Sequence, residues 1–203
     1  AVRSVDGTLY GILAGVNLED ERPGLLVWQN LSYSFSLFCH NLEVYSSLKE
    51  LSETDALTGL NNRHCYEKDL LRLRQHPQSR TACVYVDLNG LHELNNSTGH
   101  HAGDQMLQKV AEALRETLGC HPVYRIGGDE FLAFVFDCDE PSLREQCRQL
   151  EERLRQQAIH IAVGIGWHEE AAAIDELIAM AEKEMYRKKK AYYEDARHDR
   201  RRR

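Results

Sequence analysis

Apolar and polar residues follow two different spacings along the chain, and these predict its strands and helices. Short apolar runs rich in β-branched and aromatic residues predict strands at residues 8–18, 81–88, 122–126, 131–136 and 160–166. Longer stretches with helical spacing predict helices at residues 25–51, 62–76, 103–118, 142–157 and 174–190. Their order predicts an α+β fold, an α/β sandwich with a central, mostly antiparallel sheet flanked by helices and preceded by a long N-terminal helix.

The first fifty residues predict a module distinct from the rest. A strand at residues 8–18 leads through a turn at residues 19–24, which contains Pro23, into the helix at residues 25–51. This helix carries apolar residues spaced by four and three, namely Leu31, Phe35, Phe38, Leu42 and Tyr45. The stripe covers only about two heptads. Two interpretations therefore stay open, a dimerising signalling helix and a helix that packs on the following domain.

Composition excludes several classes of protein. A chain of 203 residues with 42% hydrophobic residues fits one domain and an appendage, and its net charge of −7 argues against general nucleic-acid binding. No apolar run approaches the ~18 residues of a membrane span, and no signal peptide is visible. The six cysteines lack metal-site or paired spacing, so reduced thiols and a cytoplasmic location are expected. The basic residues at the end of the chain predict a solvated tail over residues 194–203.

The run Arg-Ile-Gly-Gly-Asp-Glu-Phe at residues 125–131 is the most informative local feature. Apolar segments on both sides predict a β-hairpin with the two glycines at its tip. Asp129 and Glu130 then lie side by side at the turn. Such adjacent acids are either solvated or balanced by a cation, and on these residues alone the solvated turn is favoured.

A second acidic residue changes that interpretation. Asp87 ends the apolar strand at residues 81–88 and precedes Asn89 and Gly90. An acid at the end of a core strand is costly to bury without a partner, and ligands often bind at strand ends. Asp87 either caps the turn or, together with the hairpin acids, holds Mg²⁺ against a nucleoside triphosphate.

These elements resemble the GGDEF family of diguanylate cyclases over roughly residues 53–190. Five ordered segments carry the resemblance besides the hairpin: Asp55-Ala56-Leu57-Thr58-Gly59-Leu60-Asn61-Asn62-Arg63, then Asp87-Leu88-Asn89 with Asn95, then Gly99-His100 with Gly103-Asp104, then residues 161–166, and finally Ala181-Glu182, Met185-Tyr186 and Lys189. Several blocks in the right order are far more specific than a lone glycine motif. The resemblance implies the palm-like fold shared by nucleotide cyclases and some polymerases.

The resemblance also implies roles for individual residues. Metal ligands for Mg²⁺ or Mn²⁺ would be Asp87, the Leu88 carbonyl, Asp129 and Glu130. GTP would be bound by Gly90, Leu91, Asn95, His100, Asp104 and Lys189, with the phosphates on the backbone N–H groups of Gly90 and Leu91. Asp129 and Glu130 would be catalytic, and His92 takes the place of the family's usual catalytic lysine. A solvated surface lysine is an equally good interpretation of Lys189.

The implied activity is condensation of two GTP molecules to cyclic di-GMP and two pyrophosphates across a homodimer, because one site holds one GTP. Residues 53–193 would form the cyclase domain. Residues 1–52 would be the end of a GAF-like sensor module with its signalling helix, so a longer signalling protein with an upstream sensor is expected. No nucleic-acid partner and no membrane span are expected in this chain.

Several departures from the family pattern favour an alternative. His92, Asn89 and Asn96 replace a lysine and two aspartates, and Tyr193 stands where relatives carry a phosphate-binding arginine. A degenerate domain that binds GTP, or acts as a scaffold without turnover, is therefore the second hypothesis. The family's inhibitory Arg-x-x-Asp motif is absent at residues 118–121, which predicts no product inhibition through that site.

Overall fold

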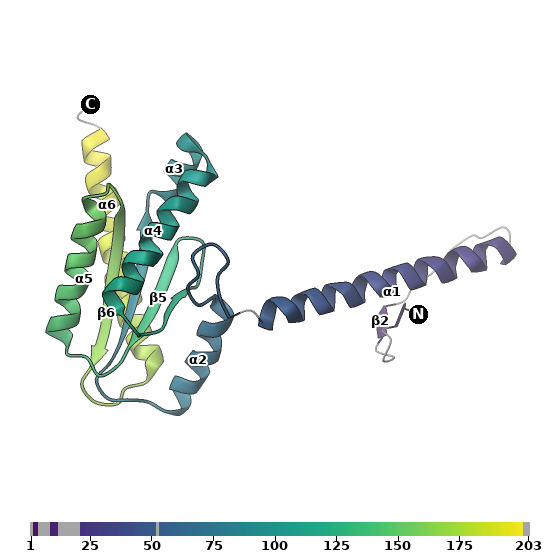
Figure 1. Cartoon of the computed structure of the whole chain (residues 1–203), viewed down its shortest axis with the longest axis horizontal. Helices are drawn as coiled ribbons and strands as arrows, with labels where there is room; N and C mark the ends of the chain where they lie inside the picture. The colour runs from purple at the N-terminus through teal and green to yellow at the C-terminus, as the bar shows by residue number, and fades with distance from the viewer. Residues whose placement is uncertain (1, 4–8, 12–20, 52, 201–203) are drawn as a thin grey trace. The chain divides into compact units, whose positions relative to one another are not determined.

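The computed structural model describes residues 2–3, 9–11, 21–51 and 53–200. The chain divides into two compact units, residues 1–52 and residues 53–203 (Figure 1). None of the helices in the described ranges combines the length and apolar character that a transmembrane segment requires.

The first unit contains a short strand pair and one long helix. Strand β1 (Val2–Arg3) pairs antiparallel with β2 (Leu9–Gly11), and α1 spans Glu21–Leu51. The predicted strand at residues 8–18 is therefore found only at Leu9–Gly11, and its other residues lie outside the described ones. The predicted turn at residues 19–24 is wrong from Glu21 onward, because proline is tolerated in the first turn of a helix. The apolar stripe of α1 is exposed.

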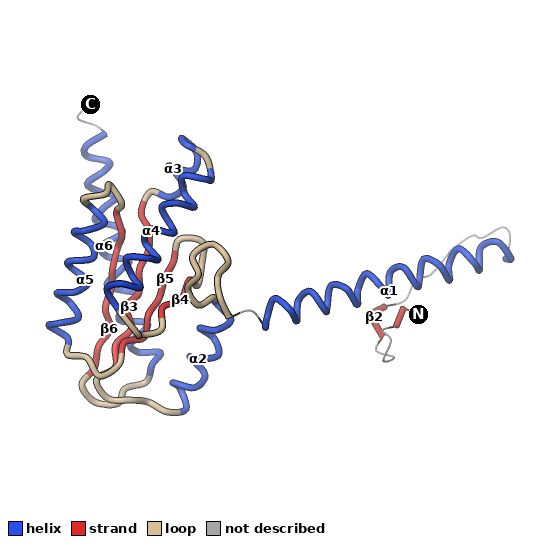
Figure 2. Tube along the Cα trace, viewed as in Figure 1, coloured by secondary structure: helices blue, strands red, loops and turns tan. Residues whose placement is uncertain are grey.

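The second unit is built on a four-stranded sheet, as the sequence predicted. Its strands are β3 (Thr81–Asn89), β4 (Val123–Arg125), β5 (Glu130–Val135) and β6 (His160–His168). Their order is β4-β5-β3-β6 (Figure 2). Every neighbouring pair is antiparallel. All residues of β3 are buried, which fits a central strand covered on both faces.

Helices cover both faces of this sheet. They are α2 (Arg63–Gln75), α3 (Leu91–Thr98), α4 (His100–Leu118), α5 (Glu140–Arg155) and α6 (Ile174–Arg200). One core cluster joins α4 and α5 to the even-numbered residues of β3, including Val84 and Val86. A second cluster joins α2 and α6 to Cys83 and Tyr85 on the opposite face. The α+β fold predicted from the sequence is thus confirmed.

Two element predictions need correction. Residues 91–98, for which no helix was predicted, form α3, because Gly90 adopts a left-handed conformation (φ 80°) that turns the chain directly from β3 into a helix. Helix α6 continues to Arg200 instead of ending at Lys190, so the segment from residue 194 that was expected to be a separate tail is helical through Arg200.

Candidate functional site

The carboxylate predicted as a metal ligand is buried near the end of the central strand. Asp87 lies on β3, and its Oδ2 accepts a hydrogen bond from Lys189 Nζ of α6 at 2.6 Å. The other oxygen, Oδ1, is buried and has no hydrogen-bond partner within the described ranges. Such an oxygen is costly to bury unless a donor or cation reaches it. Asp87 Oδ1 can therefore bind a second positively charged group in addition to Lys189.

Asp87 interacts electrostatically with Lys189, Asp129 and Glu130. Burial raises the pKa of Asp87, Lys189 acts against this, and the nearby carboxylates of Asp129 and Glu130 add to the increase. Burial acts to lower the pKa of Lys189, but its interaction with Asp87 prevails and the pKa is raised. Asp87 therefore lies where negative charge accumulates, which favours an additional cation.

The hairpin brings its two acids against the end of β3. Asp87 faces Glu130 in the β3–β5 register, and the Leu88 N–H donates to the Asp129 carbonyl oxygen at 3.0 Å. The Glu130 carboxylate accepts a hydrogen bond from the Tyr85 hydroxyl at 3.2 Å. Asp129 lies in the turn, whereas Glu130 is the first residue of β5. The four predicted metal-binding positions thus gather at the end of β3, at the first residue of β5 and in the turn directly before it.

The described residues contain no group of three His, Cys, Asp or Glu side chains already arranged around a single metal position. Instead, the Lys189 ammonium occupies the positive position beside Asp87. The residues present still fit a divalent cation, since a buried unpaired oxygen of Asp87 lies next to two further carboxylates and hard oxygen ligands suit Mg²⁺.

The predicted phosphate-binding amides lie at the start of α3. Gly90 is its N-cap residue and Leu91 its first residue, so their N–H groups belong to a helix N-terminus, which favours anions. The Gly90 N–H donates to the Tyr193 hydroxyl of α6 at 3.2 Å. The sequence had marked Tyr193 only as a missing arginine, and this contact joins residues 103 positions apart.

The two residues predicted to read guanine lie on adjoining helices. Asn95 is on α3 and Asp104 on α4, and a Cβ atom at Gly103 would overlap Asn95 Oδ1. The glycine thus allows the two helices to approach closely. Asn95 Oδ1 is buried without a partner among the described residues, while Asp104 is exposed. Two acceptors are therefore available in this region.

The two predicted histidines lie at the edge of this group. His92 is exposed on α3, and its Nε2 lies 3.0 Å from Asn96 Nδ2. His100 is the exposed first residue of α4. The roles assigned to both residues stay predictions.

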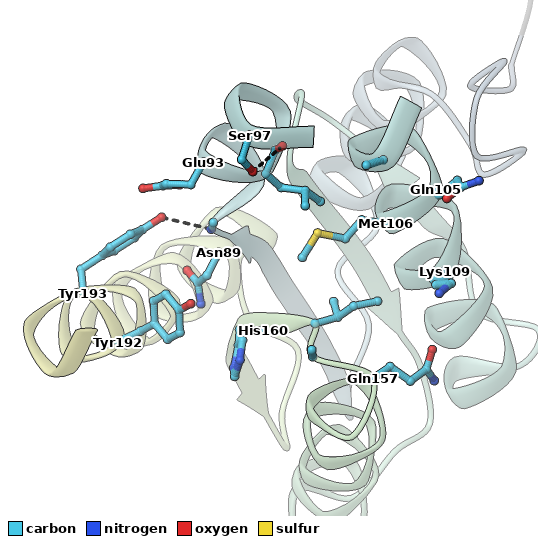
Figure 3. Close-up of a pocket in the computed structure, with 15 residues that line it drawn as sticks. Asn89, Glu93, Ser97, Gln105, Met106, Lys109, Gln157, His160, Tyr192 and Tyr193 are labelled. Carbon is cyan, nitrogen blue, oxygen red and sulfur yellow. Dashed lines mark hydrogen bonds between the residues drawn. The ribbon is translucent and has the colours of Figure 1, made fainter. Parts of the chain in front are cut away.

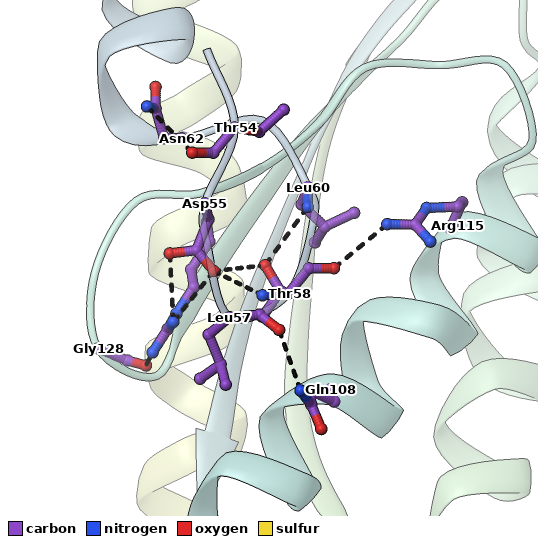
Figure 4. Close-up of polar contacts among 10 residues, drawn as sticks. Thr54, Asp55, Leu57, Thr58, Leu60, Asn62, Gln108, Arg115 and Gly128 are labelled. Carbon is purple, nitrogen blue, oxygen red and sulfur yellow. Dashed lines mark hydrogen bonds and ion pairs between the residues drawn. The ribbon is translucent and has the colours of Figure 1, made fainter. Parts of the chain in front are cut away.

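An ion pair missed by sequence reasoning holds the hairpin tip. Arg125 donates to both oxygens of Asp55, at 3.1 and 3.3 Å, and to the Gly128 carbonyl at 2.7 Å (Figure 4). The same Asp55 accepts from the backbone N–H and the hydroxyl of Thr58. Arg125 therefore ties the loop around Asp55 to the turn that precedes Glu130 and contains Asp129, the two acids predicted to be catalytic. Both residues were visible in their motifs, but nothing in their spacing indicated the pair.

Replacing Arg125 by methionine is expected to lower the free energy of unfolding by roughly 2–3 kcal/mol, because Asp55 then loses its buried partner. Only 14% of the Arg125 side chain is exposed. Urea unfolding at pH 7 measures the change. Arg63→Met is the matched control, since the Arg63 side chain is 73% exposed and its replacement should cost little. Equal losses in both variants would contradict a special role for Arg125.

The pH dependence gives a second measure of the same pair. Burial acts to raise the pKa of Asp55, but hydrogen bonds from Thr58 and Arg125 prevail and lower it. A lowered carboxylate pKa stabilises the fold above about pH 4 and loses that contribution as the pH falls through the folded-state pKa. As the pH falls from 5 through the folded-state pKa of Asp55, the free energy of unfolding should therefore decrease more for the wild type than for Arg125→Met.

A cavity of about 780 Å³ lies behind this region, between α3, α4, α6 and the start of β6 (Figure 3). Tyr192, Tyr193 and His160 line one side, and Met106 and Lys109 of α4 line the other. Asp87 and Asp104 are not among its lining residues, whereas Gly90 and Tyr193 are. The cavity therefore borders the predicted phosphate site and lies apart from the metal and guanine positions.

Comparison with known proteins identifies relatives of the second unit. The family model described as "Diguanylate cyclase, GGDEF domain" matches residues 52–194. Diguanylate cyclase DgcS of Shewanella oneidensis is 33% identical over 99 residues, covering 47% of this chain and 33% of DgcS. Cyclic di-GMP phosphodiesterase PdeB of the same organism is 34% identical over 114 residues, covering 56% of this chain and 13% of PdeB.

A solved structure agrees in fold. The coiled coil and GGDEF domain of DgcB from Caulobacter crescentus, in complex with c-di-GMP, superposes with a TM-score of 0.64 at 16% identity, covering 81% of this chain and 95% of that one. The chain spans a third or less of the length of PdeB and DgcS. Since the family model covers most of the chain, the chain belongs to the GGDEF-domain family of diguanylate cyclases.

Proposed function

We propose that residues 53–193 form an active diguanylate cyclase, which condenses two GTP molecules into cyclic di-GMP and two pyrophosphates. The observation that carries this proposal is the buried, unpaired Oδ1 of Asp87, across from Glu130 and beside Lys189. Buried polar atoms without a hydrogen-bond partner are uncommon in folded proteins, and a bound ion or a functional role is a frequent reason for them. A metal and phosphate site requires such a free acceptor.

The metal position in this proposal lies between β3 and the hairpin. Asp87, the Leu88 carbonyl, Asp129 and Glu130 are the residues that would hold Mg²⁺ or Mn²⁺. The bound metal would neutralise charge on the triphosphate and on the attacking and leaving oxygens. Glu130 is also a candidate acceptor for the proton of the 3′-hydroxyl, because Tyr85 holds its carboxylate in place.

The triphosphate in this proposal lies at the N-terminus of α3. The backbone N–H groups of Gly90 and Leu91 would bind its oxygens, and the helix dipole favours the negative charge. Lys189 would then leave Asp87 and bind the phosphates. In the structure Lys189 Nζ lies 2.6 Å from Asp87 Oδ2, so this ion pair would have to break for the exchange.

The base preference in this proposal comes from α3 and α4. A carboxylate at Asp104 can accept hydrogen bonds from both N1–H and the 2-amino group of guanine, whereas adenine offers no such pair of donors. Asn95 adds a buried acceptor next to Gly103, and His100 lies at the start of the same helix. GTP is therefore the proposed substrate.

The reaction joins two nucleotides, so two domains must face each other. The exposed apolar residues of α1 are a candidate dimerisation surface, and an upstream sensor would act through this helix. The proposal includes a cytoplasmic location, in keeping with the six free cysteines.

A degenerate, nucleotide-binding domain is the second candidate. His92 lacks the permanent charge of lysine, and in the structure Lys189 and the Gly90 N–H are already engaged by Asp87 and Tyr193. The occurrence of a phosphodiesterase among the relatives is a reason to test turnover directly.

The discriminating experiment is incubation of the full chain with GTP and Mg²⁺, followed by chromatographic detection of cyclic di-GMP. Wild-type protein should form the product, while Asp129→Asn should form none above background, and ATP should not replace GTP. Equal, background-level product from wild type and Asp129→Asn, with GTP bound by both, would favour the degenerate domain.

A further inference from the structure

Two residues one turn apart on α6 engage the groups that the proposed reaction assigns to metal and phosphate. Lys189 donates to Asp87, and Tyr193 accepts from the Gly90 N–H. Residues four apart lie on the same side of a helix, so one face of α6 covers both positions. The Lys189 ammonium can leave Asp87 and bind a phosphate instead, because it is a cation. The Tyr193 hydroxyl, in contrast, accepts a hydrogen bond from the Gly90 N–H, the same group that a phosphate would use. It therefore competes with the phosphate.

We propose that Tyr193 controls the affinity for the triphosphate by occupying the Gly90 N–H, so that the phosphates bind only after the Tyr193 hydroxyl leaves. This inference rests on the proposed function for the position of the phosphates. An arginine at this position would raise the affinity for the triphosphate. Tyr193 would lower it, because its hydroxyl occupies the Gly90 N–H that would otherwise donate to the nucleotide.

The local geometry leaves the Gly90 N–H available to an acceptor from outside α3. Gly90 precedes the first residue of α3, its backbone is left-handed, and its N–H has no acceptor inside the helix. The Tyr193 hydroxyl satisfies this N–H at 3.2 Å from α6. A phosphate oxygen would satisfy it more strongly, because hydrogen bonds to charged acceptors exceed those between neutral groups. The two acceptors therefore compete for one donor.

The surroundings hold Tyr193 in place while leaving it room to move. Its ring meets the ring of Tyr192 edge-on, with centroids 5.2 Å apart, and Tyr192 in turn packs 5.2 Å from the His160 ring. These contacts order the ring pair at the start of β6. Figure 3 shows Tyr193 at the rim of the cavity of about 780 Å³. The cavity lies directly beside Tyr193, so there is open space next to the side chain when its hydroxyl leaves Gly90.

The test is binding of guanosine 5′-[α,β-methylene]triphosphate with Mg²⁺ to the full chain, measured by calorimetry. Tyr193→Phe keeps the ring but removes the hydroxyl, so the Gly90 N–H becomes free. The analogue should bind roughly three- to tenfold more tightly to this variant, which is the ratio expected for one neutral hydrogen bond. Guanosine, which lacks phosphates, should bind both proteins equally.

Tyr186→Phe is the matched control, because Tyr186 lies on the same helix and is 67% exposed. It should bind the analogue as the wild type does. Unchanged or weaker binding by Tyr193→Phe would overturn the inference, and weaker binding would make the hydroxyl a phosphate donor instead. If the analogue binds but GTP is not converted to cyclic di-GMP, only the proposed cyclase activity is contradicted, and the inference about Tyr193 stands. Failure of both proteins to bind the analogue would overturn both proposals.

Discussion

Replacing Asp87 by asparagine is expected to reduce cyclic di-GMP formation by roughly a thousandfold, while the domain stays folded. The carboxylate would supply the most buried ligand charge of the site, and loss of several kcal/mol of charge stabilisation corresponds to about three factors of ten. Initial rates with GTP and Mg²⁺ measure this effect. Asp175→Asn is the matched control, since Asp175 is ion-paired with Arg74 away from the site.

Stability should respond in the opposite sense to activity. Burial raises the pKa of Asp87, so its ionised form costs stability in full at pH values above the folded-state pKa, and this cost declines below that pKa and disappears when the pH reaches the lower pKa of the unfolded chain. The asparagine side chain of the variant would carry no charge, and Lys189 is 31% exposed and can be hydrated. Urea unfolding should therefore show equal or greater stability for Asp87→Asn at pH 8. A loss of several kcal/mol, or retained turnover, would mean that Asp87 is a structural residue.

Much of the fold follows from local patterns. The apolar run ending at Asp87 predicted a central strand, and strand β3 is indeed buried along its whole length. The Gly-Gly pair predicted a hairpin, and β4 and β5 flank it in an antiparallel register. Alternation along β3 also divides its side chains between the two core clusters, with Val84 on one face and Tyr85 on the other. These features depend on neighbours in the sequence, which is why they were predictable.

The contacts that complete the site depend on residues far apart in the sequence. Arg125 and Asp55 are 70 positions apart, and Gly90 and Tyr193 are 103 apart. Helix α3 was missed because it is only eight residues long, its second half, Asn95–Thr98, consists of residues with low helix propensity, and its start depends on the left-handed Gly90. Propensity and periodicity describe single elements only. Packing of α6 across the sheet decides which side chains reach the end of β3.

That packing depends on two glycines of β6. A Cβ atom at Gly164 would overlap the carbonyl oxygen of Ala181, and one at Gly166 would overlap the carbonyl oxygen of Leu177. Both obstacles are backbone atoms of α6, so no rotation of a side chain can relieve them. The helix can therefore lie directly on β6, and its later residues Lys189 and Tyr193 reach Asp87 and Gly90.

Replacing Gly164 by alanine is expected to lower stability by about 3 kcal/mol or more, because α6 must move away from the sheet. For a domain of this size the melting temperature should fall by roughly 6–12 °C, and circular dichroism measures it. Gly128→Ala is the control, since a Cβ there meets nothing within 4 Å. Turnover should fall as well, because a displaced α6 carries Lys189 away from Asp87. A melting temperature equal to that of Gly128→Ala would show that α6 accommodates the extra atom and that the close approach does not fix the site.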